Sequence, residues 1–170
     1  RLVGGDVLLF YCLALLRGFL FREDMSMSEE RNSIKVRYDD TELLLKGGFY
    51  DVTDWMGKKK HLIGLWLETP DGEYYTDLTR SFGEFVGQYG CFFPDVNNES
   101  HIEQFLQDNC FAFPAGGQKT SGFVTYPAYR ISPHVMEKLF TLEEIEAYER
   151  DYGYIGNLEA EKKSFDEFIA

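Results

Sequence analysis

The first part of the chain alternates hydrophobic and polar residues, which is the pattern of strands with one buried face. Residues 33–38 alternate aliphatic or aromatic side chains with lysine and arginine, and they predict a strand. Asp39-Asp40 predicts a turn, and residues 42–46 predict a second strand that Gly47-Gly48 ends. Together these segments predict a β-hairpin.

A second hairpin is predicted around a turn with a clear sequence signature. His61 to Glu68 reads as a strand, and Glu73 to Thr79 reads as its returning partner. Between them lies Pro70-Asp71-Gly72, in which proline fixes φ and glycine tolerates positive φ. Ahead of this hairpin, Trp55 is expected to anchor residues 49–60, with an exposed Trp55 at a peptide-binding edge beside Lys58–Lys60 as the alternative.

The middle of the chain predicts short helices and one irregular strand. Hydrophobic spacing favours a helix over residues 81–89, and Ser100 with Glu103 forms a capping-box pattern for a helix ending near Asn109. Residues 115–121 predict a loop. Residues 122–130 predict a strand that is an edge strand or bulged, because Pro127 interrupts it.

The last part of the chain is predicted to be helical. Ser132-Pro133 starts one helix, and Thr141 with Glu144 gives another capping box, so two short helices are expected. Gly153 and Gly156 would end the second of them. Residues 157–170 form an amphipathic tail that either docks on the domain or frays.

These elements predict one α+β domain, with a mainly antiparallel, twisted sheet and a few short helices packed on one side. Its expected bounds are residues 27–156. An aromatic content of 16% supports a core that contains a sheet, because aromatic side chains favour strands and bury large areas.

Residues 1–26 do not fit this domain. The apolar run Val7–Leu16 is shorter than the roughly 20 residues that span a bilayer. We interpret residues 1–26 as a non-native leader read from upstream DNA, with the natural start at Met27. A membrane anchor and a core helix remain as alternatives.

The net charge of −12 is the strongest global signal for function. Half of it lies in residues 137–170, which hold ten acidic and four basic residues. Such a field repels phosphate, so direct nucleic-acid binding is not expected, whereas a basic protein partner is. The simpler interpretation is a solvated acidic surface.

The chain has no recognisable catalytic or metal-binding motif, so we predict no catalytic residue, no metal site and no cofactor. His61, His101 and His134 lack ligand spacing. Cys91 and Cys110 with His101 could imitate a nucleophile and base, but buried thiols are favoured. The cysteine pattern indicates a reduced, cytoplasmic protein, with a Cys91–Cys110 disulfide as the minor alternative.

The predicted binding residues come from three features of the chain. They are an acidic helical run, the turn after Pro94 and the aromatic closing strand. The residues are Glu143, Glu144, Glu146, Glu149, Asp151, Asn97, Asn98, Tyr126 and Tyr129.

The segment His61–Arg130 resembles an uncharacterised bacterial domain family of conjugative elements and phages of gut bacteria. The matches are a "DGEPYATLT"-like strand at residues 71–79 and a "DTNN" element at 95–98. An "EEFLxxNGLAxPTG" helix at 103–116 and a "SGFxTYPLYRF" strand at 121–131 follow. The chain departs from these patterns at Val96, Cys110 and Ala115. The resemblance implies a cytoplasmic accessory protein of a mobile element, with no assigned activity.

We therefore expect a non-enzymatic protein-binding module, which presents an anionic surface that could serve to counter a host defence system. The expected partner is a basic, nucleic-acid-binding protein, and no membrane association is expected. Two alternatives remain: a small cysteine-dependent enzyme, and a structural module that associates with itself.

Overall fold

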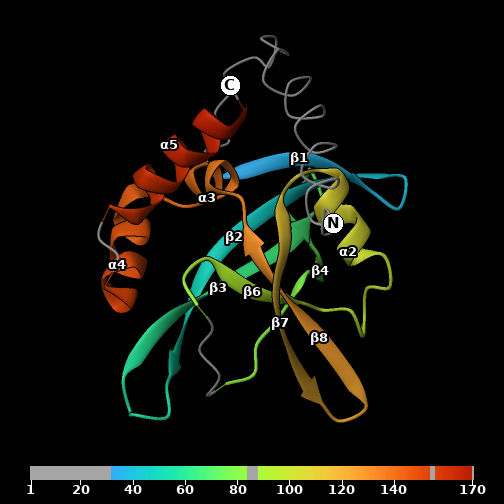
Figure 1. Ribbon diagram of the computed structural model, residues 1–170. Helices are drawn as coiled ribbons and strands as arrows, with labels where there is room; N and C mark the ends of the chain where they lie inside the picture. The colour runs from blue at the N-terminus through green and yellow to red at the C-terminus, as the bar shows by residue number, and fades with distance from the viewer. Residues whose placement is uncertain (1–31, 84–87, 154–155, 170) are drawn as a thin grey trace, which may run out of the picture.

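The computed structural model describes residues 32–83, 88–153 and 156–169. Its strands form two antiparallel sheets of four strands each, in the orders β1-β2-β3-β4 and β5-β6-β8-β7 (Figure 1). The strands are β1 (Ser33–Tyr38), β2 (Thr41–Thr53), β3 (Lys59–Glu68), β4 (Tyr74–Asp77), β5 (Thr79–Arg80), β6 (Cys91–Pro94), β7 (Ala112–Ser121) and β8 (Val124–Ile131). The described helices are α2 (Ile102–Asp108), α3 (Pro133–Leu139), α4 (Leu142–Tyr152) and α5 (Asn157–Ile169). The predicted α+β class and its antiparallel pairing are confirmed.

The helices occupy two positions around the strands. In Figure 1, α3, α4 and α5 gather on one side, and α2 lies on the other. Helix α3 packs against β1 and β2, α4 packs against β3, and α2 packs against β7. The described residues contain no helix that is long and apolar enough to cross a membrane.

Alternation along the first sheet separates a core face from an outer face. Both predicted hairpins are confirmed, since β1 pairs with β2 and β3 pairs with β4. On the inner face, the aliphatic side chains of β1, β2 and β3 are at most 8% exposed and belong to the main core. Phe49 lies at the centre of this packing, stacked on Phe140 at 4.3 Å and on Tyr148 at 4.6 Å between ring centroids.

The prediction that Gly47-Gly48 ends the second strand is wrong, because β2 continues through both glycines to Thr53. A β-carbon at Gly47 would lie 2.9 Å from Cζ of Phe140, so glycine lets the core helices approach the strand. Gly48 faces Gly64 across the β2–β3 pair. A β-carbon at Gly48 would lie 3.0 Å from the Trp66 ring. These glycines therefore lie inside the strand, where the lack of a side chain lets Phe140 and Trp66 pack against its backbone.

The predicted loop at residues 115–121 is also wrong, since this segment belongs to β7. Residues 118–121 pair with residues 124–127 of β8, and a register irregularity between Pro114 and Gln118 accommodates the residues in between. Strand β8 lies between β6 and β7, so it is not an edge strand. Pro127 is tolerated because β6 pairs with β8 only at Tyr129 and Arg130.

Of the two predicted capping boxes, one forms and the other does not. Thr141 and Glu144 form the predicted capping box, and Gly153 ends α4 in the left-handed conformation. The predicted capping box at Ser100 does not form, because His101 is the N-cap residue and makes no side-chain cap. Glu103 instead accepts a hydrogen bond from the Tyr129 hydroxyl at 2.9 Å. The tertiary contact replaces the local one.

Cys110 follows α2 with a φ of 54°, in the left-handed region. In the family motif "EEFLxxNGLAxPTG" this position is a glycine, and glycine favours the left-handed conformation after a helix. Its side chain is 3% exposed. Cys91 and Cys110 do not form a disulfide, so the minor alternative is wrong.

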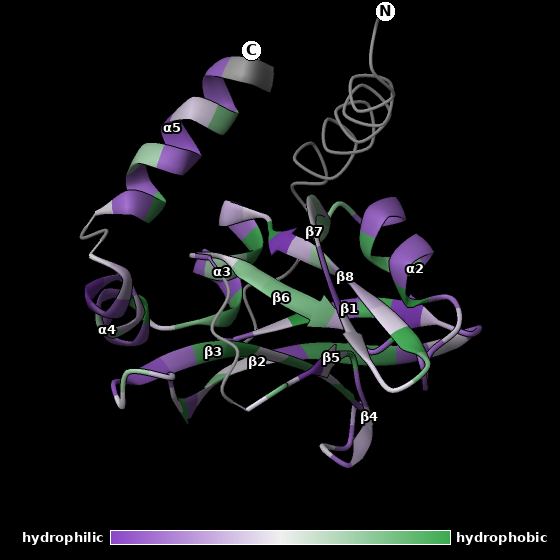
Figure 2. Cartoon of the chain, turned by 60° about the horizontal axis from the view of Figure 1, so that its bottom comes forward, coloured by the Kyte–Doolittle hydropathy of each residue, from purple (hydrophilic) through white to green (hydrophobic). Residues whose placement is uncertain are grey.

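The prediction that Trp55 anchors residues 49–60 is wrong, since its side chain is 84% exposed in the turn between β2 and β3. The predictions for residues 1–26 lie outside the described residues, and so does the centre of the helix predicted over residues 81–89. The C-terminal tail forms α5, which packs on α3 and buries Leu158. Figure 2 shows that α5 carries isolated hydrophobic positions among hydrophilic ones.

Buried tyrosines make the fold sensitive to alkaline pH. Burial is the main cause that raises the pKa of Tyr152 to about 12. Burial also raises the pKa values of a set of further tyrosines, namely Tyr38, Tyr89, Tyr129 and Tyr148. A tyrosine in the unfolded chain titrates near pH 10, and the buried tyrosines of the folded protein ionise only at higher pH. Their contribution to the free energy of unfolding is therefore complete below roughly pH 10 and is lost as the pH rises further. We expect the urea unfolding midpoint to fall steadily above this pH.

The measurement is urea unfolding as a function of pH, with tyrosinate absorbance as a second readout. Tyr152→Phe should reduce the alkaline loss of stability, because phenylalanine cannot ionise. Tyr75 is 43% exposed, so Tyr75→Phe serves as the matched control and should leave the pH profile unchanged. Identical profiles for wild type and Tyr152→Phe would contradict this assignment.

Candidate functional site

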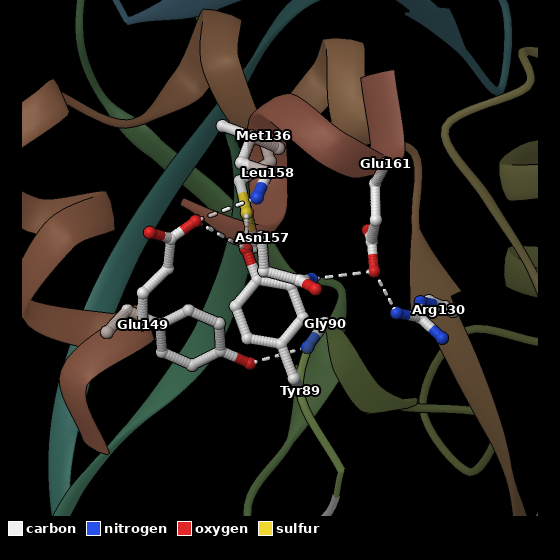
Figure 3. A network of polar contacts seen from close by, with 9 residues as sticks. Tyr89, Gly90, Arg130, Met136, Glu149, Asn157, Leu158 and Glu161 are labelled. Carbon is white, nitrogen blue, oxygen red and sulfur yellow. Dashed lines mark hydrogen bonds and ion pairs between the residues drawn. The ribbon is translucent and has the colours of Figure 1, made fainter. Parts of the chain in front are cut away.

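Glu149, one of the predicted binding residues, is buried and holds the C-terminal helix in place (Figure 3). Its Oε2 accepts the backbone N–H of Gly156 at 2.6 Å, and its Oε1 accepts the backbone N–H of Leu158 at 2.8 Å. The Tyr89 hydroxyl donates to Oε1 at 3.4 Å. A carboxylate at a helix N-terminus satisfies amides that have no partner within the helix. Glu149 is therefore a structural residue rather than part of the outer acidic surface.

A second set of contacts continues from this network toward β8. Asn157 donates to Glu161 Oε1 at 2.9 Å, and Arg130 forms an ion pair with the same carboxylate. The backbone N–H of Gly90 donates to the Tyr148 hydroxyl at 2.8 Å. Figure 3 shows how these contacts link α4, α5, β8 and the start of β6. They fix the position of α4, whose exposed face carries the other predicted glutamates.

Tyr126 and Tyr129, also predicted to bind, point into the protein and are 5% and 1% exposed. The Tyr129 hydroxyl donates to Glu103 and accepts from the Gln107 amide at 2.6 Å. Tyr126 packs its ring against Phe82 at 4.9 Å between centroids. Both side chains join elements of the second sheet to their neighbours and offer little surface to a partner.

Two of the remaining glutamates of α4 border a cleft of about 410 Å³ that the sequence did not reveal. Glu143 and Glu144 line it from the helix, and Asp51 and His61 line it from β2 and β3. Phe49 and Ala147 complete the lining. Carboxylates that are about ninety residues apart in sequence thus face the same space. We call this the acidic cleft.

His61 lies between two aspartates at the acidic cleft. Its Nδ1 is 2.5 Å from Asp151 Oδ2, and its Nε2 is 3.4 Å from Asp51 Oδ1. Asp151 also accepts the backbone N–H of His61 at 2.7 Å. These contacts orient the imidazole and attach the end of α4 to β3.

Carboxylates dominate the polar lining of the acidic cleft. No serine or cysteine lines it to serve as a nucleophile. Among the described residues, no group of three or more histidine, cysteine or acidic side chains is arranged to hold a metal ion. Glu143, Glu144 and Glu146 are exposed, so their charges can act on an approaching basic surface.

A second hollow, of about 660 Å³, lies on the outer face of the first sheet, beside β4 and β5. The predicted binding residue Asn98 lines it, together with Asp95. Asn97 is exposed and donates to the Asn98 side chain at 3.4 Å. We call this hollow the outer groove.

Cys91 lines a third cavity, of about 210 Å³, between the two sheets. Burial raises the pKa of its thiol, and the guanidinium of Arg130 opposes that effect only in part. A reactive cysteine needs a lowered pKa, so this environment does not activate Cys91 as a nucleophile. Cys110 is buried elsewhere, below α2.

The fold and these sites define an α+β protein with an acidic cleft at the start of α4. Comparison with protein families adds one result: residues 49–152 match the domain of unknown function DUF4313. This match covers more than half of the chain, so the chain belongs to that family. The acidic cleft lies within the matched residues. No curated protein and no solved structure matches the chain.

The stabilising role of Glu149 can be separated from the roles of its exposed neighbours. Glu149→Ala leaves the backbone amides of Gly156 and Leu158 without their acceptor and should lower the free energy of unfolding by about 2–4 kcal/mol. Glu149→Gln keeps one acceptor oxygen, so its loss should be smaller. Urea denaturation measures the change in stability, and hydrogen exchange over residues 157–169 measures the release of α5.

Glu146→Ala is the matched control, because Glu146 lies on the same helix and is exposed. It should change stability by no more than about 0.5 kcal/mol. Equal effects of Glu146→Ala and Glu149→Ala would mean that the buried network does not hold α5.

Proposed function

We propose that this protein is a non-enzymatic binding module that engages a basic protein partner through the acidic cleft and the neighbouring exposed face of α4. The partner class is a nucleic-acid-binding protein, such as a defence factor of the host cell. The module would be a cytoplasmic accessory protein of a mobile genetic element, as the resemblance of its motifs implies.

The observation that carries the proposal is the convergence of carboxylates on one cleft from two distant parts of the chain. Asp51 lies on a strand, and Glu143 and Glu144 lie at the start of α4. A net charge of −12 adds a long-range field of the same sign. Complementary fields accelerate encounter with a basic partner and disfavour acidic ones.

The hydrophobic floor of the acidic cleft supports a protein partner over a small ion. Phe49 and Ala147 line the cleft beneath the charged rim. Protein interfaces combine an apolar centre with a polar rim, and a cleft of this kind can accept the stem and the charged head of a lysine or arginine.

The test is a charge variant that leaves the capping box of α4 intact. In Glu143→Lys/Glu144→Gln/Glu146→Lys, glutamine can still accept the hydrogen bonds from Thr141, because glutamine serves in capping boxes. Wild type and variant are used for affinity capture from a host lysate at low and high salt, followed by mass spectrometry. The identified partner is then titrated in purified form.

We expect wild type to capture a basic protein that high salt releases, and the variant to bind it about 10–100-fold more weakly at low salt. The matched control, Asp71→Asn/Glu73→Lys/Glu167→Lys, changes the net charge equally at exposed positions outside the cleft. It should bind nearly as wild type does. If both variants weakened binding of the partner equally, the effect would come from net charge and not from the acidic cleft. An empty capture would also contradict the proposal.

A further inference from the structure

The outer groove combines aromatic side chains with carboxylates on a floor of glycines. Its aromatic lining includes Tyr50, Trp66 and Tyr74, and its acidic lining consists of Asp77 and Asp95. Aromatic faces and carboxylates are the two groups that attract organic cations most strongly. This groove and the acidic cleft share only Phe49 as a lining residue.

The glycine floor is what makes room for the aromatic rings. Gly48 of β2 and Gly64 of β3 face each other across the strands. A β-carbon at Gly48 would lie 3.0 Å from Cη2 of Trp66, and one at Gly64 would lie 3.2 Å from the Tyr50 ring. The two rings therefore lie close to the backbone of the sheet. Larger residues at either position would displace them.

Asp95 is the residue in this groove that lacks an explanation within the fold. It is 4% exposed, and its Oδ1 is the buried side-chain oxygen that has no hydrogen-bond partner among the described residues. Its Oδ2 accepts a hydrogen bond from Asn98 at 2.7 Å. A buried carboxylate oxygen without a donor is unfavourable, and native structures seldom keep one without a reason.

The backbone around Asp95 is fixed by neighbouring strands. Its N–H donates to the carbonyl of Leu78 at 3.0 Å, and the N–H of Leu78 donates to the carbonyl of Leu65 at 2.9 Å. The side chain is the part that can adjust, because χ2 of an aspartate is a soft torsion. Rotation about χ2, with loss or exchange of the Asn98 contact, would turn the unpaired oxygen toward a donor that enters the groove.

The geometry points to a binding site for a guanidinium group, such as that of an arginine side chain. A planar guanidinium stacks on an aromatic face and donates several N–H bonds to carboxylates at the same time, which a compact ammonium cannot do. Arg80 also lines the groove, but it lines the cavity beside Cys91 as well and thus lies at their boundary. This proposal is independent of the proposed function, because it concerns a different surface.

The chain offers its own reporter for this site. It contains two tryptophans, and Trp55 is 84% exposed in a turn. In the Trp55→Phe background, tryptophan fluorescence reports on Trp66 alone. Arginine amide is titrated into this protein, with citrulline amide and lysine amide as the neutral and the ammonium comparison.

We expect saturable quenching by arginine amide, with citrulline amide at least about tenfold weaker because it lacks the charge. Asp95→Asn should abolish the difference in affinity between arginine amide and citrulline amide. The carboxamide oxygen of the new asparagine can still accept the hydrogen bond from Asn98. The matched control is Asp71→Asn, which removes an exposed carboxylate outside the groove and should bind as the background does. Thermal melting verifies that each variant is folded.

Several results would overturn the assignment. They are equal binding of citrulline amide, equal binding of lysine amide, and unchanged arginine binding by folded Asp95→Asn. A capped Gly-Gly-Arg-Gly-Gly peptide distinguishes the two sources of the group. Binding of the peptide supports an arginine of a partner protein, whereas exclusion of the peptide with retained binding of arginine amide supports a free guanidine compound. The triple variant of α4 should leave this titration unchanged, so the two proposals can fail separately.

Discussion

The pairing register of β2 with β3 is the constraint on which both candidate sites depend. One face of this pair supplies Phe49, Ile63 and Leu65 to the core, and the other supplies Gly48, Gly64 and Trp66 to the outer groove. Since successive side chains alternate between faces, a slip of one residue would exchange core and surface. The glycine pair opposes such a slip, because the rings of Trp66 and Tyr50 occupy the space that any larger residue would need.

The second constraint is the buried carboxylate of Glu149, which turns the last helix into part of the domain. Without Glu149, α5 would begin with an unsatisfied, buried amide at Leu158, and the amide of Gly156 just before the helix would lose its acceptor. Its ion pairs with α3, such as Lys162 with Glu137, are exposed and contribute little by comparison. The helix is therefore held mainly by the Glu149 network and by the burial of Leu158.

The sequence was a reliable guide where local chemistry decides the structure and a poor one where tertiary contacts decide it. The Pro-Asp-Gly turn and the Thr141 capping box are local, and both were predicted. Gly47-Gly48 reads locally as a strand end, but its role is to admit Phe140 and Trp66 from elsewhere in the chain. Likewise, Glu149 has the same helical context as Glu146, and only the return of α5 distinguishes them. His61 carried no signal, because its partner Asp151 lies ninety residues further along.

The two proposed sites differ in how their charges act on a partner. The glutamates of the acidic cleft are exposed, so their field extends over a Debye length of about 8 Å in physiological salt and mainly affects the rate of encounter. Asp95 is screened from water, so it acts only on a group in direct contact and contributes to selectivity. A basic partner with one arginine placed to enter the outer groove would use both effects. High salt should then weaken its attraction to α4 more than the contact at Asp95, because buried charges are screened less than exposed ones.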